Sequence, residues 1–308
     1  MTVAVLVNAR NKAPYVADCV RSVLAQTYSP MEILLSDQGS EDGTYDIMEG
    51  VARSYNGPNK VRLLRCPDTE YRGMTGMNAH LNWLHTQTDA EFLIQTSADD
   101  LMHPDRCRRV VETWLERACD YVATSVTFVR PADGIVEQVS WHELPSAYIA
   151  LKSIIENRFG GRTSSAWTHR IWDAFGGLHG VDCQDLIVPV WAALKRGMFF
   201  LNEPLHVYLR HQDPNNTGLE TRLLMADGED AKMGVSEQIH YQMCANIRRL
   251  LGDIEGELSS TVNDDDRRET LGEALNILCR QMLIQVQAWC HERDRMTLRR
   301  ISPQAFPI

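Results

Sequence analysis

Short apolar runs alternate with longer amphipathic stretches over the first 120 residues of the chain. Runs of aliphatic residues between turn residues predict strands, and apolar positions that recur every three or four residues predict helices. The predicted strands cover residues 3–7, 32–36, 61–65 and 91–96, and the predicted helices cover residues 15–26, 45–55, 77–86 and 104–117. This alternation is typical of successive βαβ units around a mostly parallel sheet.

The pattern changes after residue 120. Residues 120–139 predict an antiparallel hairpin whose turn contains Pro131 and Gly134. Beyond His211 the strand pattern disappears, and long amphipathic stretches take its place. The longest of these stretches cover residues 234–251 and 267–292.

Three consecutive acids, Asp264, Asp265 and Asp266, precede the last amphipathic stretch. They resemble a metal site at first sight, but acidic residues at a helix start complement the positive end of the helix dipole, so we interpret them as a cap. We expect an α/β fold over residues 1–215 and an α-helical extension over residues 216–308. The extension is expected to pack on the first part or to form a dimer interface.

Composition excludes several classes of protein. A net charge of −10 argues against a general nucleic-acid or membrane-surface binder, because the chain would repel phosphate groups. The N-terminus lacks the pattern of a signal peptide, and no stretch reaches membrane-spanning length. The eight cysteines are scattered without a CxxC pair, which favours reduced thiols. These features predict a cytoplasmic protein without a transmembrane segment.

Polar loops follow three of the predicted strands, and ligands of open α/β sheets bind at these carboxyl ends. The loops are NARN at 8–11, SDQGSEDGT at 36–44 and SADD at 97–100. Asp37 is a candidate to accept hydrogen bonds from a base or ribose, but Asp37, Ser40 and Asp42 would also form an ordinary turn that caps the next helix. Asp99 is a candidate ligand for a divalent cation near phosphates, because such ions prefer carboxylate oxygens.

The stretch VLVNARNKAPYVADCVRSVLAQTYSPMEILLSDQGSEDGT at 5–44 is similar to the opening of family 2 glycosyltransferases of the GT-A fold. The resemblance extends over about residues 1–215. It implies a GT-A (Rossmann-like) fold with a nucleotide-sugar half, 1–100, and an acceptor half, 101–215. It also implies transfer of a sugar, with inversion, from a nucleotide-diphosphate donor to an acceptor hydroxyl. A UDP-sugar is the favoured donor, and Mn²⁺ or Mg²⁺ is the implied cofactor.

The resemblance implies roles for individual residues on the donor side. The candidate nucleotide-sugar residues are Asn8, Arg10, Asp37, Gln38, Arg72, Asn78, Ser97 and Asp99. Asn8 and Arg10 are candidates because they follow the first strand, and Arg72 and Asn78 would also be explained by a purely structural role. SADD stands at the place of the family's metal motif, so Asp99 is the implied metal ligand, while Asp100 either assists it or starts the next helix. The segment PLHVYLRH at 204–211 resembles the family's L-x-x-Y-R-x-H ending, which makes His211 a further ligand of the metal or diphosphate.

The segment GGLHGVDCQD at 176–185 resembles the family's segment that ends in an acidic pair. It implies that Asp185, at the start of a helix, takes the proton of the acceptor hydroxyl, with Asp182 as the alternative base. Without the upstream motifs, Asp185 would be interpreted only as an acid at a helix start. Aromatic and histidine residues nearby are candidates for the acceptor side, namely Trp167, His169 and His179, although a buried core would also explain tryptophans.

Two other functions compete with this one. A catalytically inactive relative that acts as an interaction module is suggested by Gln38, Ser97 and Gln184, which replace acids of the family pattern. A nucleotidyltransferase would also need a nucleotide fold and metal carboxylates, but the N-terminus lacks its glycine-rich, lysine-bearing phosphate loop. The expected partners are therefore a nucleotide-sugar, a carbohydrate or other hydroxyl-bearing acceptor and a second copy of the chain, without nucleic acid.

Overall fold

The structure is a computed structural model that describes residues 2–67, 73–130, 134–139, 164–181, 184–211, 226–261 and 263–301. Its contacts divide the chain into two units. The first unit consists of residues 1–179 and 184–211, and the second consists of residues 180–183 and 212–308. We describe each unit by itself.

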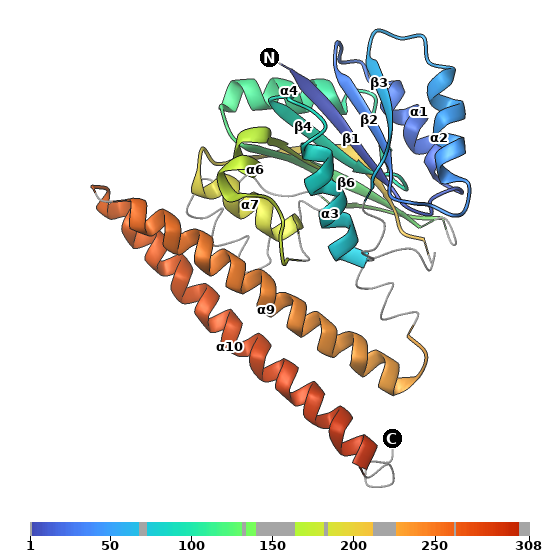
Figure 1. Cartoon of the computed structure of the whole chain (residues 1–308). Coiled ribbons are helices and arrows are strands. Elements are labelled where there is room, and N and C mark those ends of the chain that lie inside the picture. The colour runs from blue at the N-terminus through green and yellow to red at the C-terminus, as the bar shows by residue number, and fades with distance from the viewer. Residues whose placement is uncertain are drawn as a thin grey trace. The chain divides into compact units, whose positions relative to one another are not determined.

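A nine-stranded mixed sheet organises the described part of the first unit (Figure 1). The strand order is β3 (Lys60–Arg65), β2 (Glu32–Asp37), β1 (Val3–Ala9), β4 (Phe92–Ser97), β8 (Ser165–Thr168), β6 (Tyr121–Arg130), β9 (Met198–Leu209) and β5 (Leu101–Met102). The four strands from β3 to β4 are parallel, as the βαβ pattern predicted. The predicted hairpin is also confirmed, because β7 (Ile135–Val139) pairs antiparallel with β6.

Helices cover both faces of the sheet. The side chains of Val3, Val5 and Val7 share a buried core with α1 (Val16–Leu24), α2 (Thr44–Arg53) and α4 (Arg106–Arg117). Ala4 and Leu6, which alternate with them, are fully buried on the opposite face. That face carries the helices α3 (Gly73–His85), α6 (His169–Phe175) and α7 (Gln184–Leu194) (Figure 1). Burial on both faces explains why β1 is a nearly continuous apolar run.

The second unit is a helical hairpin of α9 (Gly228–Ser260) and α10 (Asp265–Ile301). The pairing of His240 with Gln285, and of Glu237 with Trp289, shows that the two helices run antiparallel. Both helices extend beyond their predicted ends. Asp264 Oδ1 accepts a hydrogen bond from the backbone N–H of Arg267 at 3.0 Å, which confirms the predicted cap. Among the described helices, none is both long and apolar enough to span a bilayer.

Two adjacent glycines end α6, and only the second is confined by its neighbours. Gly176 and Gly177 have φ values of +70° and +78°, a region that favours glycine. A Cβ at Gly176 would meet nothing within 4 Å, whereas a Cβ at Gly177 would lie 2.7 Å from Asn82 Oδ1 and 3.0 Å from Trp172 Nε1. Asn82 is also fixed, because its amide bonds both the N–H and the C=O of Leu178.

Gly176→Ala and Gly177→Ala therefore form a matched pair for testing this close contact. We expect Gly176→Ala to cost about 1 kcal/mol of unfolding free energy, since only its φ is strained. Gly177→Ala should cost about 1–3 kcal/mol more, because Asn82 and Trp172 must shift as well. Urea denaturation measures the difference. Equal destabilisation by the two variants would contradict the packing described for Gly177.

Candidate functional site

The parallel register brings the loops after β1, β2 and β4 to one edge of the sheet. Asn8 lies opposite Ser36 on one side and opposite Ser97 on the other. Its side-chain oxygen accepts a hydrogen bond from Gln95 Nε2 at 3.0 Å. Asp37 follows Ser36 and pairs with Ala9. The candidate residues on all three loops therefore share the carboxyl edge, where α/β sheets bind ligands.

Asp37 and Gln38 are buried and held by local hydrogen bonds. Asp37 Oδ2 accepts from the backbone N–H of Ser40 at 3.0 Å, and Asp37 Oδ1 accepts from the Ser40 hydroxyl. These bonds form the ordinary turn that is the alternative explanation for the Asp37 and Ser40 side chains. Gln38 Nε2 donates to the carbonyl of Gly76 on α3 at 2.9 Å. Asp37 and Gln38 are thus fixed at the edge, and their roles toward a nucleotide remain predictions.

The loop after β1 is bound to the loop after β2 by a series of hydrogen bonds. The N–H of Asn11 donates to Ser40 Oγ at 2.8 Å, and Asn11 Oδ1 accepts from the N–H of Glu41 at 2.9 Å. The N–H of Lys12 donates to Thr44 Oγ1 at 2.7 Å. Because each loop satisfies the backbone groups of the other, the two form one rigid border of the site.

Asp99, His211 and Lys12 converge at this edge. Asp99 Oδ2 lies 3.0 Å from His211 Nε2 and 2.7 Å from Lys12 Nζ. Burial alone would raise the pKa of Asp99, but the His211 and Lys12 side chains favour its charged form and lower that pKa to about 2. Tyr15 stacks on the His211 ring with centroids 4.2 Å apart, which fixes the imidazole orientation. Asp99 is therefore an ionised carboxylate in an oriented cluster.

Asp100 points away from that cluster into a fully buried network. Asp100 Oδ2 accepts from His206 Nε2 at 3.0 Å, and Oδ1 accepts from the N–H of Leu209 at 3.2 Å. Arg106 Nη1 donates to His206 Nδ1 at 3.0 Å, so the His206 proton must reside on Nε2. Burial raises the pKa of Asp100, and the adjacent charge of Asp99 adds to the rise. Both oxygens of Asp100 are thus bonded within the protein, and we no longer assign this residue as a metal ligand.

Asp99 and His211 can bind a divalent ion if a bound ligand supplies further oxygen atoms to it. Among the described residues, no group of three or more histidine, cysteine or acidic side chains gathers at one point. Asp99 and His211 supply one carboxylate and one imidazole, a set that Mn²⁺ accepts. Such an ion commonly takes its other positions from diphosphate oxygens and water. Asp99 and His211 therefore fit a metal that binds together with a nucleoside diphosphate.

Asp185 comes from a different element, in the first turn of α7, which packs against β6, β8 and β9. Its neighbour is Tyr121 at the start of β6, whose hydroxyl lies 2.6 Å from Ser165 Oγ. Burial raises the pKa of Tyr121, and the nearby charge of Asp185 adds to that rise. Asp185 is thus a partly buried carboxylate at a helix N-terminus, and its role as base stays a prediction. The alternative base, Asp182, lies outside the described residues.

The other donor-side candidates are distributed around the edge. Arg10 is half-buried in the loop after β1, and Asn78 is buried on α3. Ser97 ends β4 next to Asn8. Arg72 lies outside the described residues. The roles of Lys12, Tyr15, Arg106 and His206 were not predictable from the sequence, because they depend on partners far along the chain. The one available signal was that Lys12 follows the first strand within a polar loop.

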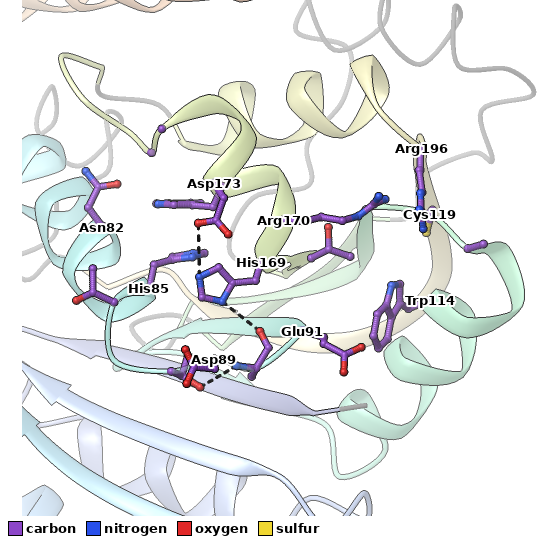
Figure 2. A pocket seen from close by; sticks show the side chains of 18 of the residues that line it. Asn82, His85, Asp89, Glu91, Trp114, Cys119, His169, Arg170, Asp173 and Arg196 are labelled. Atoms are coloured by element: carbon purple, nitrogen blue, oxygen red, sulfur yellow. Dashed lines mark hydrogen bonds and ion pairs between the residues drawn. The ribbon is translucent and has the colours of Figure 1, made fainter.

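The histidines predicted for the acceptor side lie at the opposite end of the sheet. The N–H of His169 donates to the carbonyl of Glu91, which precedes β4, whereas Asp99 follows β4. Six strand residues at about 3.3 Å each separate the two by about 20 Å. His169 and His179 line a cavity of about 920 Å³ together with Asn82, Trp114 and Asp173 (Figure 2). Trp167 is a core residue whose indole N–H donates to His85 Nε2 at 3.0 Å. We therefore withdraw all three from the acceptor side.

Comparison with known proteins identifies the class. Residues 4–185 match the sequence model of the family described as Glycosyl transferase family 2, which is more than half of the chain, so the chain belongs to this family. Its family 2 glycosyltransferase region has a mixed α/β fold of the GT-A type.

Curated relatives match part of the chain. It is 25% identical over 140 residues to an uncharacterized glycosyltransferase of Nostoc sp., covering 46% of this chain and 41% of the relative. It is 24% identical over 163 residues to the putative glycosyltransferase EpsH of Bacillus subtilis, covering 52% and 44%. The chain thus spans less than half the length of these relatives.

Solved structures share the fold at low sequence identity. S. aureus TarS 1–349 in complex with UDP-GlcNAc superposes with a TM-score of 0.58 at 12% identity, covering 99% of this chain and 93% of that chain. The mannosyltransferase PcManGT from Pyrobaculum calidifontis, in complex with GDP-Man and Mn²⁺, gives a TM-score of 0.52 at 16% identity, covering 98% and 87%.

The buried network predicts which arginine of α4 matters. Arg106→Met should destabilise the fold by about 3–5 kcal/mol, because it leaves His206 and Asp100 without their buried cationic partner. Arg108→Met, on the same helix, removes a half-exposed arginine that pairs with Glu112 and Asp105, so little change is expected. Urea denaturation of both variants measures the contrast. Similar stability of the two variants would contradict the network.

Proposed function

We propose that this glycosyltransferase moves a sugar from a nucleotide-diphosphate donor, with a UDP-sugar favoured, to an acceptor hydroxyl in an inverting, metal-dependent reaction. The observation that carries the proposal is the convergence of Asp99 and His211 on one point at the carboxyl edge of the sheet, with Oδ2 and Nε2 3.0 Å apart. Asn8 and Asp37 stand in the same row of strand ends. A metal site and a nucleotide site would therefore adjoin.

The donor would be bound by the loops after β1, β2 and β4. The Asp37 carboxylate can accept hydrogen bonds from ribose or base donors once it exchanges its bonds to Ser40. Gln38 Nε2 donates a hydrogen bond to the carbonyl of Gly76. Its amide oxygen would then be the acceptor for a base N–H such as that of uracil. The related structures hold UDP-GlcNAc in TarS and GDP-Man in PcManGT. We favour a UDP-sugar for this chain because the resemblance to the family implies it.

Catalysis divides between the two halves of the unit. Asp99 and His211 would hold Mn²⁺ or Mg²⁺, which stabilises the negative charge of the departing nucleoside diphosphate. Asp185 would accept the proton of the acceptor hydroxyl, since a carboxylate within hydrogen-bond reach can act as a general base. Inversion would require Asp185 to deprotonate an acceptor hydroxyl on the side of the sugar opposite the leaving diphosphate.

The function is tested by transfer and donor hydrolysis with UDP-sugars and GDP-sugars, with and without Mn²⁺. Asp185→Asn should lower kcat by about 10²–10⁴-fold, because a general base contributes that much. Asp173→Asn, an exposed acid on α6 that lines the cavity at the other sheet edge, is the matched control and should be as active as the wild type. Unchanged turnover in Asp185→Asn would refute the assignment of the base.

Metal dependence is tested in the same assay. Asp99→Ala should remove the stimulation by Mn²⁺, while Asp46→Ala, an exposed acid on α2, should retain it. Sugar transfer by Asp99→Ala at the wild-type rate would contradict a metal held by Asp99. If the wild type transfers sugar at the same rate with and without Mn²⁺, the proposed sugar transfer stands and its metal dependence is refuted.

For the helical hairpin we retain a role in packing or dimerisation. Leu283 and Ile284 on α10 are each 59% exposed, and Tyr241 on α9 is 58% exposed. Large apolar side chains exposed on a helical surface are available for contact with another protein. If they mediate a dimer, light scattering will give twice the mass of the chain for the wild type and a single mass for Leu283→Glu with Ile284→Glu. A monomeric wild type would contradict dimerisation.

A further inference from the structure

Lys12 and His211 share a single oxygen atom of Asp99. Lys12 Nζ lies 2.7 Å from Oδ2, and His211 Nε2 lies 3.0 Å from the same atom. An sp² carboxylate oxygen has two lone pairs. Both are engaged here, so a metal ion that binds Asp99 through Oδ2 requires one of the two side chains to leave.

His211 is the side chain that can stay. Its ring stacks on Tyr15 at 4.2 Å between centroids, with an interplanar angle of 18°, and only 9% of the residue is exposed. A neutral imidazole is itself a metal ligand, so once the proton that Nε2 donates to Asp99 has moved to Nδ1, Nε2 can bind an arriving ion while the ring stays in place. The site therefore holds one of the two groups in place for the metal.

For an ion that binds Asp99 through Oδ2, Lys12 is the side chain that leaves. A protonated ammonium has three donors and no lone pair, so it cannot ligate a metal. The Lys12 ammonium and a divalent ion on the same carboxylate would repel each other strongly, because the site is largely shielded from water. The four-carbon stem is flexible, which allows the ammonium to move while the backbone stays.

The backbone of Lys12 is fixed at the border of the site. Its N–H donates to Thr44 Oγ1 at 2.7 Å, the preceding residue Asn11 bonds Ser40 and Glu41, and the N–H of Ala13 donates to Asp42 at 3.0 Å. A displaced ammonium therefore stays close to the strand edge. A diphosphate bound beside the metal would be the anionic group adjacent to the displaced ammonium, and lysine is a frequent partner of phosphates.

We propose that Lys12 is the resting counterion of Asp99 and that it exchanges with the divalent metal, so that metal binding transfers the ammonium from Asp99 to the donor diphosphate. The inference rests on the proposed function, because it assumes a metal and a diphosphate at this edge. The exchange keeps the buried carboxylate neutralised when no metal is bound. It also couples metal binding to donor binding, since the diphosphate provides the released ammonium with a new partner.

The first test measures Mn²⁺ binding to the nucleotide-free protein by the loss of the free Mn²⁺ electron paramagnetic resonance signal. Lys12→Met keeps the length of the stem and removes the charge. It should bind Mn²⁺ about tenfold more tightly than the wild type, because the competing cation is gone. Lys12→Arg keeps the charge and should bind Mn²⁺ as weakly as the wild type.

Lys60→Met is the matched control for removing an ion-paired lysine. Lys60 Nζ lies 3.0 Å from Glu32 on the outer strand pair β2 and β3, and its side chain is 72% exposed. This variant should bind Mn²⁺ as the wild type does. Melting temperatures of all variants show whether each one is folded.

The second test measures binding of UDP and of GDP in saturating Mn²⁺ by calorimetry. Lys12→Met should bind the better of the two about tenfold more weakly than the wild type, because the diphosphate beside the metal loses its ammonium partner. Lys60→Met should again match the wild type. Equal nucleotide affinity of Lys12→Met and the wild type would overturn the transfer of Lys12 to the diphosphate.

The outcomes separate this inference from the proposed function. Mn²⁺ binding that is lost in Asp99→Ala but has equal strength in Lys12→Met and the wild type overturns the exchange and leaves the metal site intact. Mn²⁺ binding that Asp99→Ala does not weaken removes the metal from Asp99, which overturns the exchange and the metal-dependent function together. Failure of folded Lys12→Met to bind Mn²⁺ at all also overturns the exchange.

Discussion

The buried contact of Asp100 with His206 and Arg106 is the constraint on which the site depends. It joins the turn after β4, the strand β9 and the helix α4 at a place from which water is excluded. Asp99 directly precedes Asp100 in the chain, and His211 lies two residues after Leu209, whose N–H bonds the Asp100 carboxylate. Asp99 and His211 are 112 positions apart, and their 3.0 Å approach follows from this anchor.

A polar network of this kind is costly to bury. Each charged or polar group loses its water, and only a complete set of partners offsets the loss. The network is arranged so that Arg106 donates to His206 and His206 donates to Asp100, with the Leu209 N–H on the remaining oxygen. The same stretch of chain thus places Asp100 in the buried network and its neighbour Asp99 beside His211 and Lys12. The SADD motif therefore contributes one acid to the proposed site.

Sequence patterns were informative wherever the signal was local. The strands β1 to β4, the helices between them and the β6–β7 hairpin follow from hydrophobic periodicity and turn residues, because these depend on neighbours within about ten positions. The cap at Asp264 was predictable for the same reason. In contrast, β8 and α6 were not predicted. The strand β8 is four residues long, and its identity comes from pairing with β4 and β6, which the local sequence does not encode.

By itself, the sequence determined the α/β class, the family and the loops that form the edge, since a long motif at fixed spacing specifies them. Only the tertiary structure decided which polar residues meet. It placed Lys12 on Asp99, turned Asp100 into the core and moved His169 to the far end of β4. The physical reason is that periodicity indicates which face of an element is buried. The distance between residues of different elements depends on strand order, register and the direction of each strand, and these are fixed only when the whole sheet assembles.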